Sequence, residues 1–213
     1  MSFTPIDPAA WERTEYLTCF GTTAVYMTVQ VDITSLLEEV RRRGLRLYPA
    51  LVYCAAHVIN GHPEFRYGRN ARGEIGLWDV VHPFYTVPRA DNPELFSMKY
   101  TPYVPDFSAF CSAFSADYSR AAACGRLMAD DPLPENICGI SAVPGTSFTS
   151  FSFGGDPKGD FTPFVLYGRH FQERNRVRLP VSGEFSHAVN DGVHISRFFQ
   201  ELEETANSLF SRE

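Results

Sequence analysis

The sequence predicts an α+β fold with a largely mixed β-sheet. Segments with helical periodicity and segments with strand-like alternation follow one another, in neither a strict βα order nor an all-strand order. The 213 residues are 44% apolar and 14% aromatic, which is enough material to bury a sizeable core. The chain has no internal repeat, low-complexity tract or convincing linker, so we expect one domain over residues 1–213.

The first part of the chain predicts a helix, a strand and two further helices, in that order. Residues 7–20 predict a short helix with Asp7 as its cap. Residues 22–34 alternate and are rich in β-branched side chains, which indicates a strand. Apolar residues at helical spacing predict a helix over 35–44, and a more apolar helix over 48–60 that we expect to be buried.

The remaining chain predicts short strands and two further helices. Glycine, proline and asparagine turns separate strands expected around Arg66, Gly76, Tyr85 and Phe96. A long amphipathic helix is expected over 106–128, capped by Asp106 or Ser108. Later strands are expected over 137–143, 148–153, 164–170 and 177–185. From about Asp191, one helical face gathers Ile195, Phe198, Phe199, Leu202, Ala206 and Leu209.

Composition excludes several function classes. The net charge of −6, without a Lys/Arg-rich segment, argues against a nucleic-acid partner. No apolar run approaches the roughly 20 residues that span a bilayer, and the N-terminus lacks the pattern of a secretory signal. Five scattered cysteines without a CxxC pair indicate buried, reduced thiols and a cytoplasmic enzyme. The six histidines lack paired-ligand spacing, so we expect no metal and no prosthetic group.

The stretch "FSHAVNDGVHISRFF" places His187 four residues before an Asp-Gly pair, where an extended segment turns into a helix. An imidazole at a strand end, facing a cleft, can act as a general base near neutral pH. Asp191 can cap the helix, and Gly192 lets backbones approach closely. A plain turn with a satisfied histidine would give the same pattern, so the motif alone leaves both interpretations open.

Seven stretches spread over almost the whole chain match one family in order and spacing. They are "AAWERTEYL", "VDIT", "LYPALVY", "EIGLWDVVHPFYTV", "LFSMKYTPY", "PENICGISAVP" and "SHAVNDGVH". On these residues the chain resembles the chloramphenicol acetyltransferase family of the trimeric, His-dependent type, whose signature is HHAVxDGxH. The resemblance implies a two-layer sandwich in which helices cover a mixed β-sheet, the CoA-dependent acyltransferase fold.

The resemblance also implies an activity, which is transfer of acetyl from acetyl-CoA to a hydroxyl of chloramphenicol. His187 takes the position of the general base, which removes the acceptor's proton while its oxygen attacks the thioester directly in a ternary complex. Ser141 in "GISAVP" matches the serine that hydrogen-bonds the oxyanion. Asp191 and Arg13 match an ion pair that holds the histidine loop in place.

A homotrimer is implied as well, with the histidine of one subunit and much of the acceptor pocket of its neighbour at each site. Phe20, Phe96, Phe151 and Phe153 fall at or near acceptor-pocket positions, although each also suits core packing. Arg169 and His170 match positions that approach CoA. The arginines of "YGRHFQERNRVR" could equally form the solvated face of a hairpin. The run "GGDPKGD" at 154–160 lacks a phosphate-loop pattern and predicts a plain turn.

Several residues depart from the family pattern. Leu166, also at an acceptor-binding position, replaces a threonine that helps to hold a water against the transition state. Phe20 replaces a pocket tyrosine, and Gly145 replaces a tryptophan near CoA. Ser186 and Asn190 replace a histidine and a cysteine of the signature. The general base, the ion pair and the serine are kept, but the acceptor is left open.

Three alternatives therefore stand beside chloramphenicol acetylation. The first is an acetyltransferase for a different small hydroxyl compound. The second is a catalytically weak trimer that binds CoA or another ligand. The third is the catalytic core of a dihydrolipoamide acyltransferase, which is disfavoured because the sequence shows no lipoyl module or linker and has Ala188 where that signature has arginine.

Overall fold

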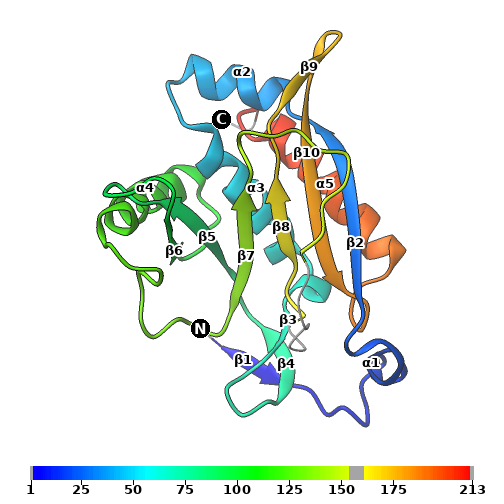
Figure 1. Ribbon diagram of the computed structural model, residues 1–213. Coiled ribbons are helices and arrows are strands. Elements are labelled where there is room, and N and C mark those ends of the chain that lie inside the picture. The colour runs from blue at the N-terminus through cyan, green and yellow to red at the C-terminus, as the bar shows by residue number, and fades with distance from the viewer. Residues whose placement is uncertain (1, 154–160, 212–213) are drawn as a thin grey trace.

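A mixed β-sheet forms the centre of the molecule (Figure 1). The computed structural model describes residues 2–153 and 161–211. Within those residues the sheet has seven strands in the order β2-β10-β8-β7-β5-β6, with β9 pairing β10. Their bounds are β2 (Ala24–Asp32), β5 (His82–Pro88), β6 (Phe96–Tyr100), β7 (Ile137–Ala142), β8 (Phe164–Tyr167), β9 (Phe171–Glu173) and β10 (Arg176–Ser186). Strand β7 runs parallel to β5 and to β8, and the other pairs are antiparallel.

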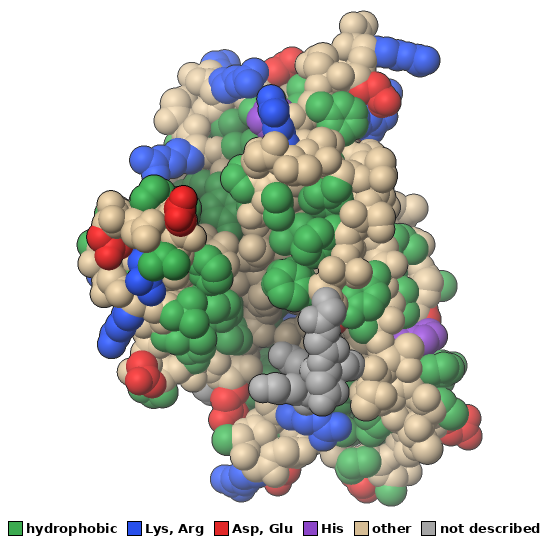
Figure 2. Space-filling view, in the orientation of Figure 1, with side chains coloured by type: hydrophobic (Ala, Val, Ile, Leu, Met, Phe, Trp, Pro, Cys, Tyr) green, Lys and Arg blue, Asp and Glu red, His purple; other side chains and the backbone are tan. Residues whose placement is uncertain are grey.

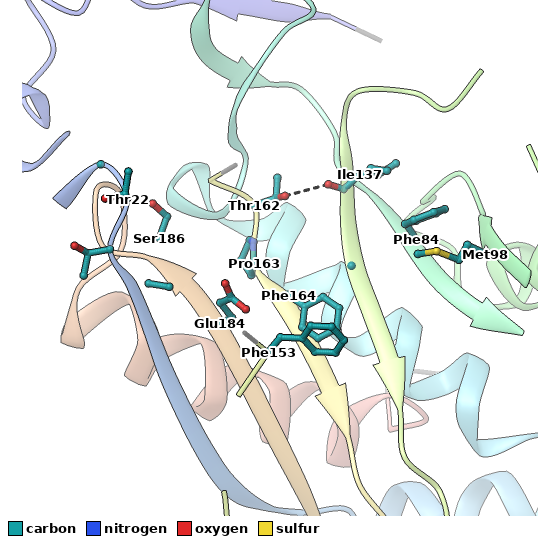
Figure 3. A pocket seen from close by; sticks show the side chains of 14 residues that line it. Thr22, Phe84, Met98, Ile137, Phe153, Thr162, Pro163, Phe164, Glu184 and Ser186 are labelled. Atoms are coloured by element: carbon teal, nitrogen blue, oxygen red, sulfur yellow. Dashed lines mark hydrogen bonds between the residues drawn. The ribbon is translucent and has the colours of Figure 1, made fainter. Parts of the chain in front are cut away.

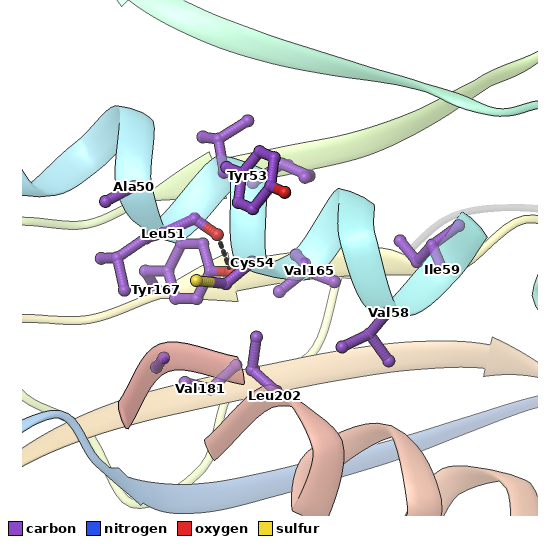
Figure 4. Close-up of a cluster of buried hydrophobic side chains, with 14 of the residues drawn as sticks. Ala50, Leu51, Tyr53, Cys54, Val58, Ile59, Val165, Tyr167, Val181 and Leu202 are labelled. Carbon is purple, nitrogen blue, oxygen red and sulfur yellow. Dashed lines mark hydrogen bonds between the residues drawn. The ribbon is translucent and has the colours of Figure 1, made fainter. Parts of the chain in front are cut away.

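Helices cover one face of this sheet (Figure 1). They are α2 (Thr34–Arg42), α3 (Leu47–Gly61), α4 (Phe107–Ala123) and α5 (Gly192–Ser208). Helix α3 packs against both α4 and α5, which explains why ten of its fifteen residues are buried. Figure 4 shows its side chains beside those of β8, β10 and α5, where the Tyr167 hydroxyl donates a 2.8 Å hydrogen bond to the Leu51 carbonyl.

Successive side chains of each strand point alternately into the helix-covered core and to the opposite face of the sheet. On β7 the core residues Cys138 and Ile140 are buried, whereas Gly139 and Ser141 point to the other face. The segment after β7, residues 143–153, crosses this second face. The Gln30 amide donates to the carbonyl of Phe148 in this segment at 3.1 Å.

A second, three-stranded sheet lies at one end of the molecule. Within the described residues its order is β1-β4-β3, formed by β1 (Phe3–Pro5), β4 (Ile75–Trp78) and β3 (Tyr67–Arg69). The 3₁₀ turn η1 (Pro63–Phe65) leads into β3, and α1 (Thr14–Phe20) follows β1. Strand β1 was missed by the sequence because three residues carry too short an alternation to stand out.

Three sequence predictions are wrong in their boundaries or type. Helix α1 begins at Thr14 and not near Asp7, because the Asp7 carboxylate instead accepts from the Ala9 amide at 2.9 Å in a turn. Helix α4 ends at Ala123, before the predicted end at 128. Residues 148–153 form no strand, since their backbone bonds mainly to side chains of the sheet, such as Gln30.

Strand β9 and the turn η1 were not predicted, but the other elements agree with the sequence to within a few residues. The α+β class with helices covering a mixed sheet is confirmed. Asp106 rather than Ser108 caps α4, accepting from the Ala109 amide at 2.7 Å. Asp191 caps α5 in a capping box with His194. The prediction of a single domain over residues 1–213 stays a prediction, and the turn predicted over 154–160 lies outside the described residues.

Candidate active site

His187 lies in the turn between the end of β10 and the start of α5. Its backbone amide donates to the Thr23 carbonyl at 2.9 Å, which ties the turn to the entry of β2. The Phe20 ring stacks on the imidazole with centroids 4.4 Å apart and planes at 30°. The imidazole thus packs against an aromatic ring, while the residue stays only half-buried.

The hydrogen bond of the His187 ring determines which nitrogen is free. Nδ1 lies 3.0 Å from the Asn190 carbonyl oxygen, which can only accept. In the neutral imidazole the proton therefore belongs to Nδ1, and Nε2 carries the lone pair. A fixed tautomer with an unblocked Nε2 is what a general base requires.

Arg13 holds the His187 turn at two points. Its Nε donates to the Ala188 carbonyl at 3.1 Å, and its Nη1 donates to the Asp191 carboxylate at 3.3 Å. The guanidinium also lies 4.0 Å above the Tyr16 ring, which favours a cation there. Because α1 starts directly after Arg13, this helix anchors the arginine, and the arginine in turn connects α1 to the start of α5.

Asp191 is ionised in this arrangement. Partial burial acts to raise the pKa of its carboxyl, but the hydrogen bond from Arg13, the charge of His194 and the Val193 amide outweigh burial and lower the pKa below its ordinary value. The carboxylate therefore caps α5 and pairs with Arg13 at the same time. Its partners are Arg13 and the start of α5.

Ser141 lies on β7, on the sheet face opposite the helices. Its hydroxyl is 3.3 Å from the Thr86 hydroxyl on β5. The residue beside it on β8 is Leu166, whose side chain is only 2% exposed. Leu166 offers no hydrogen-bond donor, so the polar surface around Ser141 comes from β5 and not from β8.

Within one chain, Ser141 and His187 lie far apart. The strand register places Ser141 beside Leu166, and Leu166 beside Ser182 on β10. His187 follows Ser182 by five residues and lies two strands away from β7. At about 3.4 Å per residue and about 4.8 Å per strand, the separation is roughly 20 Å. One chain therefore does not bring both side chains to the same reacting group.

Two adjoining cavities open on the face opposite the helices. The first has a volume of about 370 Å³ and the second about 560 Å³, and they share Phe84, Met98, Gly139, Phe153 and Phe164. Figure 3 shows the rings of Phe153 and Phe164 in the middle of the first cavity; their centroids are 5.2 Å apart. Ser141 lines the second cavity. Their shared wall is apolar and aromatic, which suits a ligand with an aryl ring.

Only some of the residues expected to bind an acceptor line the two cavities. Phe153 lines both cavities, and Phe96 lines the second. Phe20 lies instead against His187. Phe151 and Leu166 line neither cavity: the Phe151 carbonyl accepts from the Ser182 hydroxyl at 2.7 Å, beside the buried Leu166.

Glu184 is a cavity residue that the sequence did not single out. It lines the first cavity with Thr22 and Ser186, on the side facing Phe84 and Met98 (Figure 3). Burial raises the pKa of its carboxyl, and the hydrogen bond with the Tyr26 hydroxyl opposes this only in part. The sequence could have indicated Glu184 through strand alternation, because residues 184 and 186 share one face of β10.

Comparison with known proteins adds the family. A family model described as chloramphenicol acetyltransferase matches residues 1–203. The chain belongs to the chloramphenicol acetyltransferase family. A chloramphenicol acetyltransferase of Clostridium perfringens is 36% identical over 212 residues, which cover 98% of this chain and 96% of the relative. A solved chloramphenicol acetyltransferase structure matches with a TM-score of 0.80 at 21% identity, over 95% of this chain and 99% of its own.

A second solved structure shows how widely the fold is shared. The dihydrolipoamide acetyltransferase of Azotobacter vinelandii matches with a TM-score of 0.69 at 16% identity, over 99% of this chain and 93% of its own. At that identity the likeness shows the fold alone. The family resemblance, the fold class and the expectation of an acyltransferase are confirmed by these comparisons together with the family match.

The expected CoA contacts lie at the far end of β8. Arg169 and His170 follow this strand and line a third cavity of about 530 Å³. Two other arginines of the same stretch behave as hairpin residues: Arg176 pairs with Asp32 at 3.3 Å, and Arg178 pairs with Glu173 at 3.2 Å. Of the four arginines in this stretch, two therefore form ion pairs and Arg169 faces a cavity.

Across residues 2–153 and 161–211, no three His, Cys, Asp or Glu side chains gather in a way that would hold a metal ion. None of the described helices combines the length and apolarity that a bilayer crossing requires.

Proposed function

We propose that this member of the chloramphenicol acetyltransferase family transfers acetyl from acetyl-CoA to a hydroxyl of chloramphenicol. The observation that carries the proposal is the fixed tautomer of His187, whose Nδ1 is bound to the Asn190 carbonyl and whose Nε2 has no hydrogen-bond partner among the described residues. Nε2 accepts the proton of the acceptor hydroxyl as its oxygen attacks the thioester carbonyl of acetyl-CoA. No covalent acyl-enzyme is needed, and the thiolate of CoA leaves as the carbonyl re-forms.

Ser141 stabilises the oxyanion of the tetrahedral intermediate in this proposal. Because Ser141 and His187 are roughly 20 Å apart in one chain, the serine must come from a second copy of the protein. A homotrimer with sites between subunits meets this requirement, since each copy then gives its histidine to one site and its serine to another. The exposed aromatic side chains of the sheet face, Phe96 at 47% and Phe153 at 53%, support burial against a partner.

The cavities support an aromatic acceptor. Figure 2 shows hydrophobic side chains across the centre of the face that carries them. Phe84, Phe153 and Phe164 offer ring faces and edges to an aryl group, and Thr86 and Ser141 offer hydroxyls near the second cavity's floor. Acetyl-CoA is the second substrate, with Arg169 and His170 as its contacts. The cytoplasm, where acetyl-CoA is made available, is the compartment we propose.

A different small hydroxyl acceptor is the second candidate, favoured by one observation. Glu184 places a carboxyl in the first cavity, and no lysine or arginine lines that cavity among the described residues. A carboxyl there favours the binding of an acceptor that donates hydrogen bonds or carries a positive charge. The weakly catalytic trimer is supported by Leu166, which replaces a polar side chain beside Ser141 with an apolar one.

One assay separates these candidates. Purified protein is incubated with acetyl-CoA and either chloramphenicol or a panel of small alcohols and amino alcohols, and CoA release is followed together with product mass. We expect acetyl-chloramphenicol from the wild type and none from His187→Ala. Turnover with an amino alcohol alone favours the second candidate. Equal turnover by His187→Ala contradicts the mechanism. Acetyl-CoA binding without turnover on any acceptor favours the weakly catalytic trimer.

A further inference from the structure

The third cavity gathers basic side chains from two separate segments. Arg41 comes from the last turn of α2, while Arg169 and His170 follow β8. Ser147, from the segment that crosses the sheet, and Gln172 of β9 add a hydroxyl and an amide. No aspartate or glutamate lines this cavity among the described residues. Figure 2 shows basic side chains and a histidine together at the end of the molecule where α2 and β9 lie.

The two arginines of this cavity lack the acidic partners that other arginines of the same segments have. On α2, Arg42 and Arg43 pair with Glu39 at 2.6 and 3.2 Å. No ion pair joins Arg41 or Arg169 to an acidic side chain within residues 2–153 and 161–211. Burial lowers the pKa of His170, and the nearby charges of Arg41 and Arg169 lower it further, so the cations do act on one another. Cations brought together without an anion favour an anionic ligand.

We propose that Arg41 is a specificity-determining residue for CoA, completing with Arg169 and His170 a pocket that binds a phosphate of the coenzyme. This rests on the proposed function, which supplies CoA as the ligand. A guanidinium reaches phosphate oxygens with two parallel N–H donors, and a neighbouring hydroxyl and amide extend the set. Nothing in the sequence set Arg41 apart from the two arginines that follow it, because only the helix turn decides which of the three faces the cavity.

The ligand phosphate has two possible sources within CoA, the 3′-phosphate of the ribose and the pyrophosphate. Three probes distinguish them by calorimetry: CoA, dephospho-CoA, which lacks the 3′-phosphate, and pantetheine, which lacks all phosphates. Arg41→Gln removes the charge and keeps a polar side chain. Arg42→Gln removes the same charge from the next residue of α2, outside the cavity, and is the matched control.

For Arg41→Gln we expect a roughly five- to tenfold higher Kd for CoA at low salt, as for loss of one exposed charge-assisted contact. The Kd of pantetheine stays unchanged. If the Kd of dephospho-CoA also stays unchanged, the contact is the 3′-phosphate; if it rises equally, the contact is the pyrophosphate. Arg42→Gln leaves all three values within twofold. The effect of Arg41→Gln shrinks as salt rises, because partly exposed charges are screened.

Two results overturn the proposal. One is an unchanged Kd for CoA in Arg41→Gln; the other is an equal loss in Arg42→Gln, which would show only a general effect of net charge. The measurement needs no turnover, so its failure is distinct from that of the proposed function. If the wild type acetylates chloramphenicol and Arg41→Gln binds CoA normally, the phosphate pocket is refuted and the proposed activity stands. A wild type that binds CoA through Arg41 but acetylates nothing refutes the activity alone.

Discussion

Replacing Arg13 tests whether the His187 turn depends on one bridging side chain. Arg13→Met removes the bond from Nε to the Ala188 carbonyl and the bond from Nη1 to Asp191 while keeping an apolar stem of similar length. A hydrogen bond that involves a charged group contributes about 1.5–3 kcal/mol. Asp191 is 34% exposed, so solvent reduces the share of that ion pair to about 1 kcal/mol or less.

We therefore expect Arg13→Met to lower the free energy of unfolding by about 2 kcal/mol, measured by urea denaturation. The activity falls further, because a base displaced by about 1 Å loses on the order of 100-fold in rate. Arg13→Lys keeps the charge but has one terminal nitrogen and cannot make both bonds, so its kcat also falls, by roughly tenfold. Arg42→Met, which breaks an exposed pair with Glu39, is the control and leaves kcat unchanged. Full kcat in a folded Arg13→Met protein would refute this account of the turn.

Three further predictions concern the cavity, the thiols and the ion pair. Gly139→Ala places a Cβ within 2.4 Å of the Phe164 ring, so the ring must move; we expect KM for the acceptor to rise several-fold while the Kd of CoA stays constant, and an unchanged KM contradicts the cavity assignment. Burial raises the pKa of Cys54 to about 12, so in a thiol titration at pH 8 exposed Cys19 reacts at once and Cys54 only after unfolding; early labelling of Cys54 would show an open core. The pKa of Asp191 is lower in the folded protein than in the unfolded chain, so its ion pair stabilises the fold fully above the unfolded pKa and is lost as pH falls through the folded pKa. The difference in free energy of unfolding between wild type and Asp191→Asn should therefore be constant from about pH 6 to 9 and shrink below about pH 4, as measured by urea denaturation. A difference that shrinks on the alkaline side would show that another group is responsible.

The sequence anticipated those parts of the fold that are encoded locally. The buried helix α3 is apolar on nearly every side, and α5 has a clear apolar face and begins at a capping aspartate. Both helices can therefore be predicted without knowledge of the tertiary structure. Residues 148–153 are rich in phenylalanine and threonine or serine, a composition that favours a strand. They form none because side chains of β2 and β10 take up several of their backbone groups, which is a tertiary effect.

The site was predictable in its motif and not in its geometry. The signature around His187 and the partner Arg13 stand out by resemblance, although they are far apart in the chain. That Asn190 would fix the tautomer through its carbonyl could not be foreseen, because any residue supplies a carbonyl and only the turn aims it. Glu184 and Arg41 were missed for the same reason: each is one charged residue among several, and the strand pleat or helix turn decides which one faces a cavity.

The central claim is that one reaction centre takes His187 from one chain and Ser141 from another. His187→Ala and Ser141→Ala proteins, each nearly inactive alone, are unfolded together in equal amounts and refolded, and acetyl transfer to chloramphenicol is then measured. Random assembly into rings restores both side chains at about a quarter of the sites, so we predict about a quarter of wild-type activity. Activity no higher than the mean of the two separate proteins would contradict a shared site.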